Sequence, residues 1–181
     1  MAEPHLSERS IAAGRDFMAA LETLGLRPEG LFWAHDQTID EQVLVLVTAM
    51  FDHAGPLRVN EKLLRAFNLA ATPREISPFI VRLHSPTEDI AAELSEFADF
   101  YRKNAIQFKV GEHGDVEGTW SLNDPTASSF GRLSIERIGI PNTDLLLYLR
   151  GFYKMDLQKK SPEQRLREWS RFSSRVDALA A

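Results

Sequence analysis

The sequence contains no cysteine among its 181 residues. This absence excludes a disulfide framework, a metal site with thiolate ligands and a cysteine nucleophile. No apolar run approaches the roughly 18 residues that a transmembrane helix needs, and the N-terminus carries no apolar segment typical of a secretory signal. The sequence therefore predicts a soluble protein of the reducing cytoplasm with no membrane association.

Short catalytic signatures are missing as well. There is no Walker A pattern, no G-x-G-x-x-G, no G-x-S-x-G and no H-E-x-x-H. Their absence removes the enzyme classes that a single sequence usually reveals. The sequence predicts no cofactor and no metal, and it favours a protein without catalytic activity over an enzyme.

Charge is distributed unevenly along the chain. The net charge is −5, yet residues 131–181 hold 10 of the 21 Lys and Arg and only 6 of the 26 Asp and Glu. A basic C-terminal part on an acidic body is found in proteins that bind nucleic acid or an acidic partner. The other interpretation is that the basic part docks on the acidic body of the same molecule.

The longest apolar run covers residues 42–51 and predicts a central strand that is buried on both faces. A second run at 79–85 alternates apolar and polar residues, which is typical of a strand with one buried face. A helical pattern over 57–70 lies between them, and one connecting helix makes two strands parallel. A short strand at 31–34 is expected to pair antiparallel with the first run.

The remaining segments complete an α+β fold. We expect helices at 7–24, 86–103, 141–149 and 161–180, a hairpin of strands at 106–110 and 116–122, and a third meander strand at 133–138. The predicted fold is one domain over residues 1–181, with 1–5 disordered. It has a mixed sheet of about five or six strands, in the order β-β-α-β-α-β-β-β after an N-terminal helix, and two C-terminal helices.

The best-defined candidate site lies at the C-terminal ends of the two parallel strands, where open α/β sheets place their ligands. Four residues should emerge together at this edge: Asp52, His53, His84 and Ser85. A carboxylate and two imidazoles could bind one divalent metal or supply a general base. The opposing interpretation is that the histidines are a turn residue and a solvent-facing strand residue, because no spacing motif accompanies them. His35 should fall at the opposite edge, which argues against a site of three histidines.

Two loops are weaker candidates. The hairpin tip at 112–115 places His113 between acidic residues, and the segment 123–129 is rich in Ser, Asn and Asp. Turn chemistry accounts for the tip. The second loop could be a lid or only a connection.

The C-terminal helix carries a narrow apolar seam on a basic background. The apolar members recur every three or four residues: Leu166, Trp169, Phe172, Val176 and Leu179. Such a seam must be buried, either on its own domain or against a partner. In the second case Trp169 would anchor a protein partner or a homodimer. The nearby arginines, among them Arg165 and Arg171, would then steer an acidic partner.

Three functions remain open. The favoured hypothesis is a cytoplasmic protein-interaction module without catalysis that uses the C-terminal helix. The second is a small-molecule or metal-dependent enzyme at the sheet edge described above. The third is nucleic-acid binding through a helix-turn-helix at 41–53, 60–69 and 72–83. Pro78 interrupts the recognition helix of that arrangement, and few basic residues would face phosphate, which argues against nucleic acid.

Overall fold

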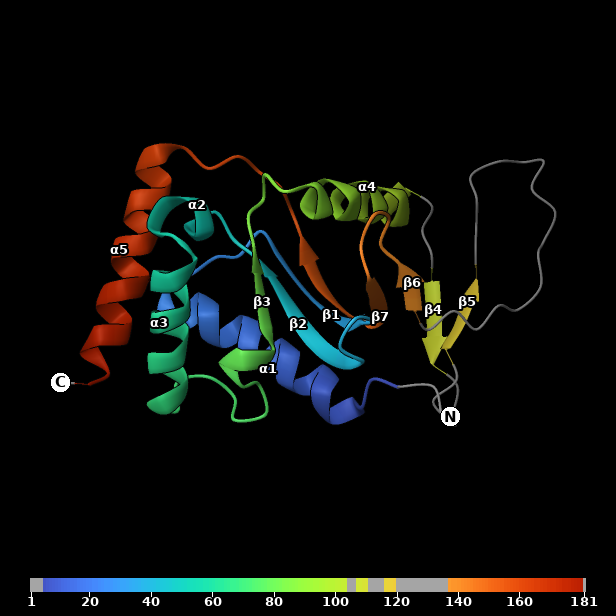
Figure 1. Ribbon diagram of the computed structural model, residues 1–181, viewed down its shortest axis with the longest axis horizontal. Coiled ribbons are helices and arrows are strands. Elements are labelled where there is room, and N and C mark those ends of the chain that lie inside the picture. The colour runs from blue at the N-terminus through green and yellow to red at the C-terminus, as the bar shows by residue number, and fades with distance from the viewer. Residues whose placement is uncertain (1–4, 104–106, 111–115, 120–136, 181) are drawn as a thin grey trace.

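The computed structural model describes residues 5–103, 107–110, 116–119 and 137–180 (Figure 1). The elements in this part of the chain are α1 (Glu8–Leu24), β1 (Gly30–Asp36), β2 (Glu41–Val47), α2 (Met50–Ala54), α3 (Pro56–Asn68), the 3-10 helix η1 (Pro78–Ile80), β3 (Val81–His84), α4 (Asp89–Lys103), β4 (Gln107–Val110), β5 (Val116–Thr119), β6 (Arg137–Gly139), β7 (Leu145–Met155) and α5 (Pro162–Ala178). The protein is α+β with a mixed sheet, as the sequence predicts. None of the helices in the described ranges combines the length and apolarity that crossing a bilayer requires.

The main sheet of the described residues has the strand order β3-β2-β1-β7-β6. β1 and β2 are antiparallel and β2 and β3 are parallel, so both strand pairings expected for the first half of the chain are confirmed. Val47 lies opposite His84 in the parallel pair, which brings the C-terminal ends of the two strands to one sheet edge. The five residues from Val43 to Val47 have no exposed surface, as a central strand covered on both faces requires.

The segment after residue 140 departs from the prediction. Leu145–Met155 is not a buried helix but the strand β7, which pairs antiparallel with β1 on one side and with β6 on the other. A near-continuous apolar run suits a buried helix and a central strand equally well. Here the second edge of β1 offers backbone hydrogen-bond partners that only a strand can use. The prediction of two C-terminal helices is therefore wrong, and α5 is the one helix after β7 in the described residues.

The predicted three-stranded meander is also wrong. β4 and β5 form the expected hairpin, but they make a two-stranded sheet of their own. β6 begins at Arg137 and pairs with β7 instead. The predictions for residues 1–4, the hairpin tip at 112–115 and the loop at 123–129 lie outside the described residues.

The two faces of the main sheet are covered by different helices (Figure 1). Leu44 and Leu46 of β2 pack on the side of α1, α3 and α5, whereas Val43 and Val45 pack on the side of α4. This division follows from the alternation of side chains along a strand. In Figure 1, α3 and α5 lie beside each other at one end of the molecule. The two-sided cover explains why β2 is apolar at every position from Val43 to Val47.

The long helices at both ends of the chain begin at capping serines, where the sequence predicts the two helices to start. The Ser7 hydroxyl accepts a hydrogen bond from the backbone N–H of Ser10 and starts α1. Ser161 and Gln164 form a complete capping box at the start of α5. Gly25 ends α1 with a φ of 93°, a left-handed conformation that glycine adopts without strain.

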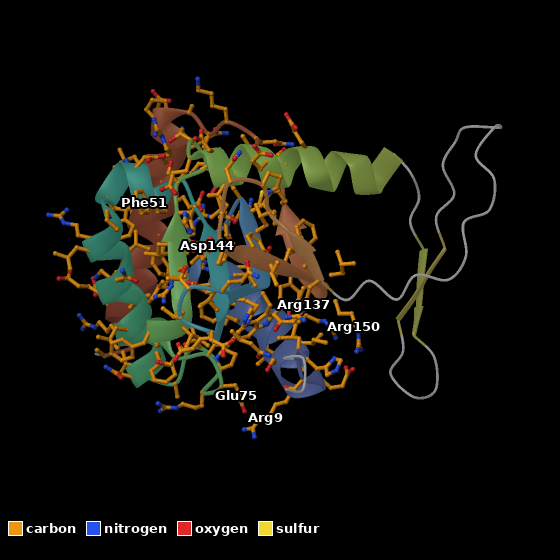
Figure 2. All side chains as sticks on the ribbon, turned by 45° about the vertical axis from the view of Figure 1, so that its right-hand side comes forward. Arg9, Phe51, Glu75, Arg137, Asp144 and Arg150 are labelled. Atoms are coloured by element: carbon orange, nitrogen blue, oxygen red, sulfur yellow. The ribbon has the colours of Figure 1, made fainter. Side chains whose placement is uncertain are left out.

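An ion pair ties the start of α1 to the loop that precedes η1. The Arg9 Nη2 and Glu75 Oε1 atoms are 2.9 Å apart, and Figure 2 shows the two side chains close together at one end of the molecule. The Arg9 hydrogen bond lowers the pKa of Glu75. Because the Arg9 side chain is largely exposed, this pair contributes little to stability.

Candidate functional site

The structure brings Asp52 and Ser85 together at the predicted sheet edge. The Ser85 hydroxyl donates a hydrogen bond to Asp52 Oδ2 over 2.7 Å. α2 positions Asp52 directly after β2, and Ser85 directly follows β3. The backbone N–H of Thr48 donates to the His84 carbonyl, which extends the parallel pair by one residue and fixes this corner. Ser85 is buried, and its oxygen also accepts from the backbone N–H of Thr87, as a turn-forming serine does.

His84 pairs with a residue that the sequence analysis did not assign to the site. Its Nδ1 lies 2.6 Å from Glu88 Oε2, and the other Glu88 oxygen accepts from the backbone N–H of Ser85. Burial raises the pKa of Glu88, but the Ser85 N–H and the His84 ring outweigh it and leave that pKa below its usual value. The pair lines an open depression of about 510 Å³, which Asp89, Asn142 and further residues complete.

His53 does not join this arrangement. It lies exposed on α2, and its side chain makes no hydrogen bond or ion pair in the part of the chain that the structure describes. His35 lies at the other end of the sheet, as expected, where its Nε2 is 3.2 Å from Asp40 Oδ1. Among the described residues, no group of three or more His, Asp or Glu side chains is placed to hold a metal ion. The four predicted residues thus separate into an Asp52–Ser85 contact, a His84–Glu88 pair and an isolated His53.

The apolar seam of α5 is largely occupied within the chain. Phe172 and Val176 have no exposed surface and belong to the core that α1 and α3 share with the sheet. Trp169 is partly buried, with its ring centroid 6.1 Å from that of Phe172. Leu166 is 55% exposed, and Leu179 is 46% exposed. Full burial of Phe172 and Val176 is worth roughly 1.5–3 kcal/mol each, so α5 is held firmly against the body of the protein.

The arginines of α5 have different surroundings. Arg165 is half-buried, and its Nε has no hydrogen-bond partner in the described residues. Arg175 donates to the Thr23 carbonyl at the end of α1, where a cation suits the helix dipole. Arg171 is exposed, and its aliphatic stem packs on Gly25, where an added Cβ would lie 2.7 Å from Arg171 Cγ. Gly25 therefore serves both the turn after α1 and the approach of α5.

Beside α5 lies a cavity of about 410 Å³ that the sequence analysis did not foresee. Its walls come from the segment before β1, the end of β7 and the residues after it, and the first half of α5. The cationic lining residues are Arg27, Lys154, Lys159, Lys160, Arg167 and Arg171. The acidic lining residues are Glu29, Asp156 and Glu168. The lining is therefore positively charged in a chain whose net charge is −5.

Lys160 connects the three walls of this cavity. Its ammonium lies 2.8 Å from Glu29 Oε1 and 2.7 Å from Glu168 Oε2, and it donates to the Arg27 carbonyl over 2.6 Å. The contact with Glu29 has the distance of an ion pair without the alignment of a hydrogen bond. Glu168 Oε1 accepts from the backbone N–H of Arg27 as well. With oxygens of Glu29, Glu168 and Arg27 all within 2.8 Å, the Lys160 ammonium is engaged by the walls of the cavity and braces them.

Glu29 links the cavity to the predicted site. Its side chain is buried, and Oε2 accepts from the backbone N–H of Ala49, directly before α2. Its backbone continues the sheet, because its N–H donates to Val47 and its carbonyl accepts from Asp156. The cavity and the Asp52–Ser85 contact therefore flank the same C-terminal end of β2.

The other five cations form the rim of the cavity: Arg27, Lys154, Lys159, Arg167 and Arg171. In the described part of the chain their side chains make no ion pair and no hydrogen bond. The rim residues are spread from position 27 to position 171, so no local sequence motif identifies them. The excess of basic residues after position 131 was the one available signal.

The chain matches no protein-family model, no curated protein and no solved structure. Function therefore has to be inferred from the geometry of the two sites at the end of β2.

Proposed function

We propose that the protein is a non-catalytic binding module that holds an acidic ligand in the cationic cavity beside α5. The observation that supports this proposal is the rim of five cations that have no partner in the described residues. A volume of about 410 Å³ falls within the range of small-molecule sites. This proposal changes the protein-interaction hypothesis in two respects. The ligand is a small acidic molecule in place of a protein partner, and the basic outer side of α5 binds it, whereas Phe172 and Val176 anchor the helix to the core.

The electrostatics of the molecule favour an anion at this place. Like charges that line one cavity repel each other, and dissolved salt weakens this repulsion because most of the rim side chains are exposed. An anionic group between Arg167 and Arg171 of α5 and Arg27 on the facing wall relieves that repulsion. Because the remainder of the chain is acidic, the local positive field also guides an anion to this cavity. We include the cytoplasm as the location in this proposal, since the chain has no cysteine.

The test is a calorimetric titration of the full chain with two acidic probes, inorganic pyrophosphate and citrate. We expect binding of at least one probe, with an affinity that falls as the salt concentration rises. The double substitution Arg167→Gln/Arg171→Gln should weaken that binding at least tenfold. Arg58→Gln is the matched control, because Arg58 is exposed on α3 and does not line the cavity. Absence of binding by both probes, or equal weakening by the control, would refute the proposal.

A second candidate function is general-base chemistry at His84. The 2.6 Å contact with Glu88 orients the imidazole, and the pair lines the depression of about 510 Å³. We would compare His84→Ala with His53→Ala in the hydrolysis of p-nitrophenyl acetate. A catalytic His84 predicts that only the first change removes the activity, since His53 has no orienting partner in the described residues. Equal loss in both variants, or none, would contradict a catalytic role.

A further inference from the structure

We infer that the ligand of the cationic cavity is a small molecule carrying a phosphate ester or a diphosphate group. This inference rests on the proposed function, namely that the cavity binds an acidic ligand, and it specifies the chemical class of that ligand. Three features of the cavity favour phosphate over carboxylate: the number of cations that have no partner in the described part of the chain, the presence of three guanidinium groups among them, and a brace that holds the walls in place.

The number of rim cations exceeds what a single carboxylate neutralises. Five cationic side chains without a partner among the described residues surround about 410 Å³. A carboxylate brings one negative charge and two oxygens, whereas a phosphate monoester brings nearly two charges and three strong acceptor oxygens. Of the three acidic lining residues, Glu29 and Glu168 are already engaged by Lys160 and by backbone N–H groups. Because Lys160 supplies one positive charge to two carboxylates, the six cations and three carboxylates of the lining together leave a net charge of +3.

The kind of cation also favours phosphate. Arg27, Arg167 and Arg171 bring planar guanidinium groups from two facing walls. A guanidinium can donate two parallel hydrogen bonds to one phosphate, and three such groups can share its oxygens. Lys154 and Lys159 add point charges that suit a second phosphate group.

The walls are held in place before any ligand arrives. Lys160 joins the segment before β1 to α5 through Glu29, Glu168 and the Arg27 carbonyl. Burial of Phe172 in the core fixes α5 from its other side. A preformed site loses less conformational freedom on binding. More of the favourable interaction between the cations and the ligand is therefore available as affinity and selectivity. The brace and the rim are different residues, which lets an experiment separate folding from binding.

The experiment compares inorganic pyrophosphate with citrate, which carries a similar charge near neutral pH. Both are titrated into the full chain at matched ionic strength, with inorganic phosphate as a third probe. We expect pyrophosphate to bind at least tenfold more tightly than citrate. Inorganic phosphate should bind more weakly than pyrophosphate, down to an affinity too low to measure. Arg167→Lys/Arg171→Lys keeps the charge but removes the paired hydrogen bonds, so it should remove the preference for pyrophosphate. Melting temperatures of all variants within a few degrees of the parent confirm that only the site has changed.

The outcomes separate the two proposals. Equal affinity for citrate and pyrophosphate overturns the phosphate inference and leaves an acidic-ligand site in place. No binding of any probe overturns both proposals. Pyrophosphate binding that survives Arg167→Gln/Arg171→Gln places the site elsewhere and also overturns both. A preference for pyrophosphate that both arginine double variants abolish supports the inference.

Discussion

Replacing Lys160 by methionine should destabilise the protein far more than a substitution in the loop after the last strand usually does. Methionine keeps the unbranched stem and removes the ammonium that lies between Glu29 and Glu168. These two residues are 3% and 9% exposed, so the change leaves two buried carboxylates without their counter-charge. Removing one partner of a buried ion pair costs about 3–5 kcal/mol. The Lys160 side chain is 19% exposed, which admits some water and places the expected loss at about 3 kcal/mol.

Urea unfolding followed by tryptophan fluorescence measures this loss, because the chain contains three tryptophans. With a slope of about 2 kcal/mol per molar urea, a loss of about 3 kcal/mol lowers the midpoint by roughly 1.5 M. Lys159→Met is the matched control: it changes the same residue type one position earlier, at an exposed site with no ion pair in the described residues. The control should shift the free energy of unfolding by less than about 0.5 kcal/mol.

A double-substitution cycle tests the reason for the loss. Glu168→Gln removes one of the two carboxylates but keeps an oxygen that can accept from the Arg27 N–H. If uncompensated charge causes the loss, Glu168→Gln should recover about 1–2 kcal/mol in the Lys160→Met background. Two results would refute the role of Lys160 as a brace. Either Lys160→Met lowers the free energy of unfolding no more than Lys159→Met does, or the losses from Lys160→Met and Glu168→Gln simply add in the double variant.

Two further changes test other contacts of the fold. Gly14→Ala should cost about 1–2 kcal/mol of unfolding free energy, because an added Cβ would lie 2.6 Å from Tyr153 Cε2. In a Tyr153→Ala background the same change should become neutral or stabilising, since alanine favours the helix; a loss of equal size there would exclude the clash. The pKa of Glu88 is lower in the folded than in the unfolded protein. Ionised Glu88 therefore stabilises the fold at pH values above its unfolded pKa, and this stabilisation is lost as the pH falls through its folded pKa. Chemical unfolding of the parent and Glu88→Gln at several pH values should therefore differ by up to about 1 kcal/mol near neutrality and converge in acid, and a constant difference would contradict the assignment.

Local chemistry was sufficient to predict the helices with clear ends and the first strand pairs. Ser7, Gly25 and the Ser161 capping box mark their termini in the sequence, and the structure has those termini. The crossover from β2 to β3, which runs through α2, α3 and η1, returns the chain to the starting edge of the sheet and so makes the pair parallel. This pairing also explains why the sequence alone predicts Asp52 and Ser85 at one edge of the sheet.

Other parts of the site depend on partners that a sequence does not identify. His53 follows the same strand as Asp52, yet the short helix α2 turns it to solvent. His84 finds Glu88, four residues further along, because the chain turns between β3 and α4. Residue order alone indicates neither outcome, since each depends on the direction in which the backbone leaves the strand.

The amino-acid sequence by itself determined the class of the fold, the apolar centre at 42–47 and the basic character of the last third of the chain. Each follows from composition, periodicity or local capping, which act over a few residues. Tertiary structure decided that Leu145–Met155 is a strand, because the free edge of β1 accepts it. It also decided that Phe172 and Val176 face their own core and leave the basic side of α5 outward. The cavity around Lys160 exists for the same reason: long-range packing brings together segments that are more than a hundred residues apart.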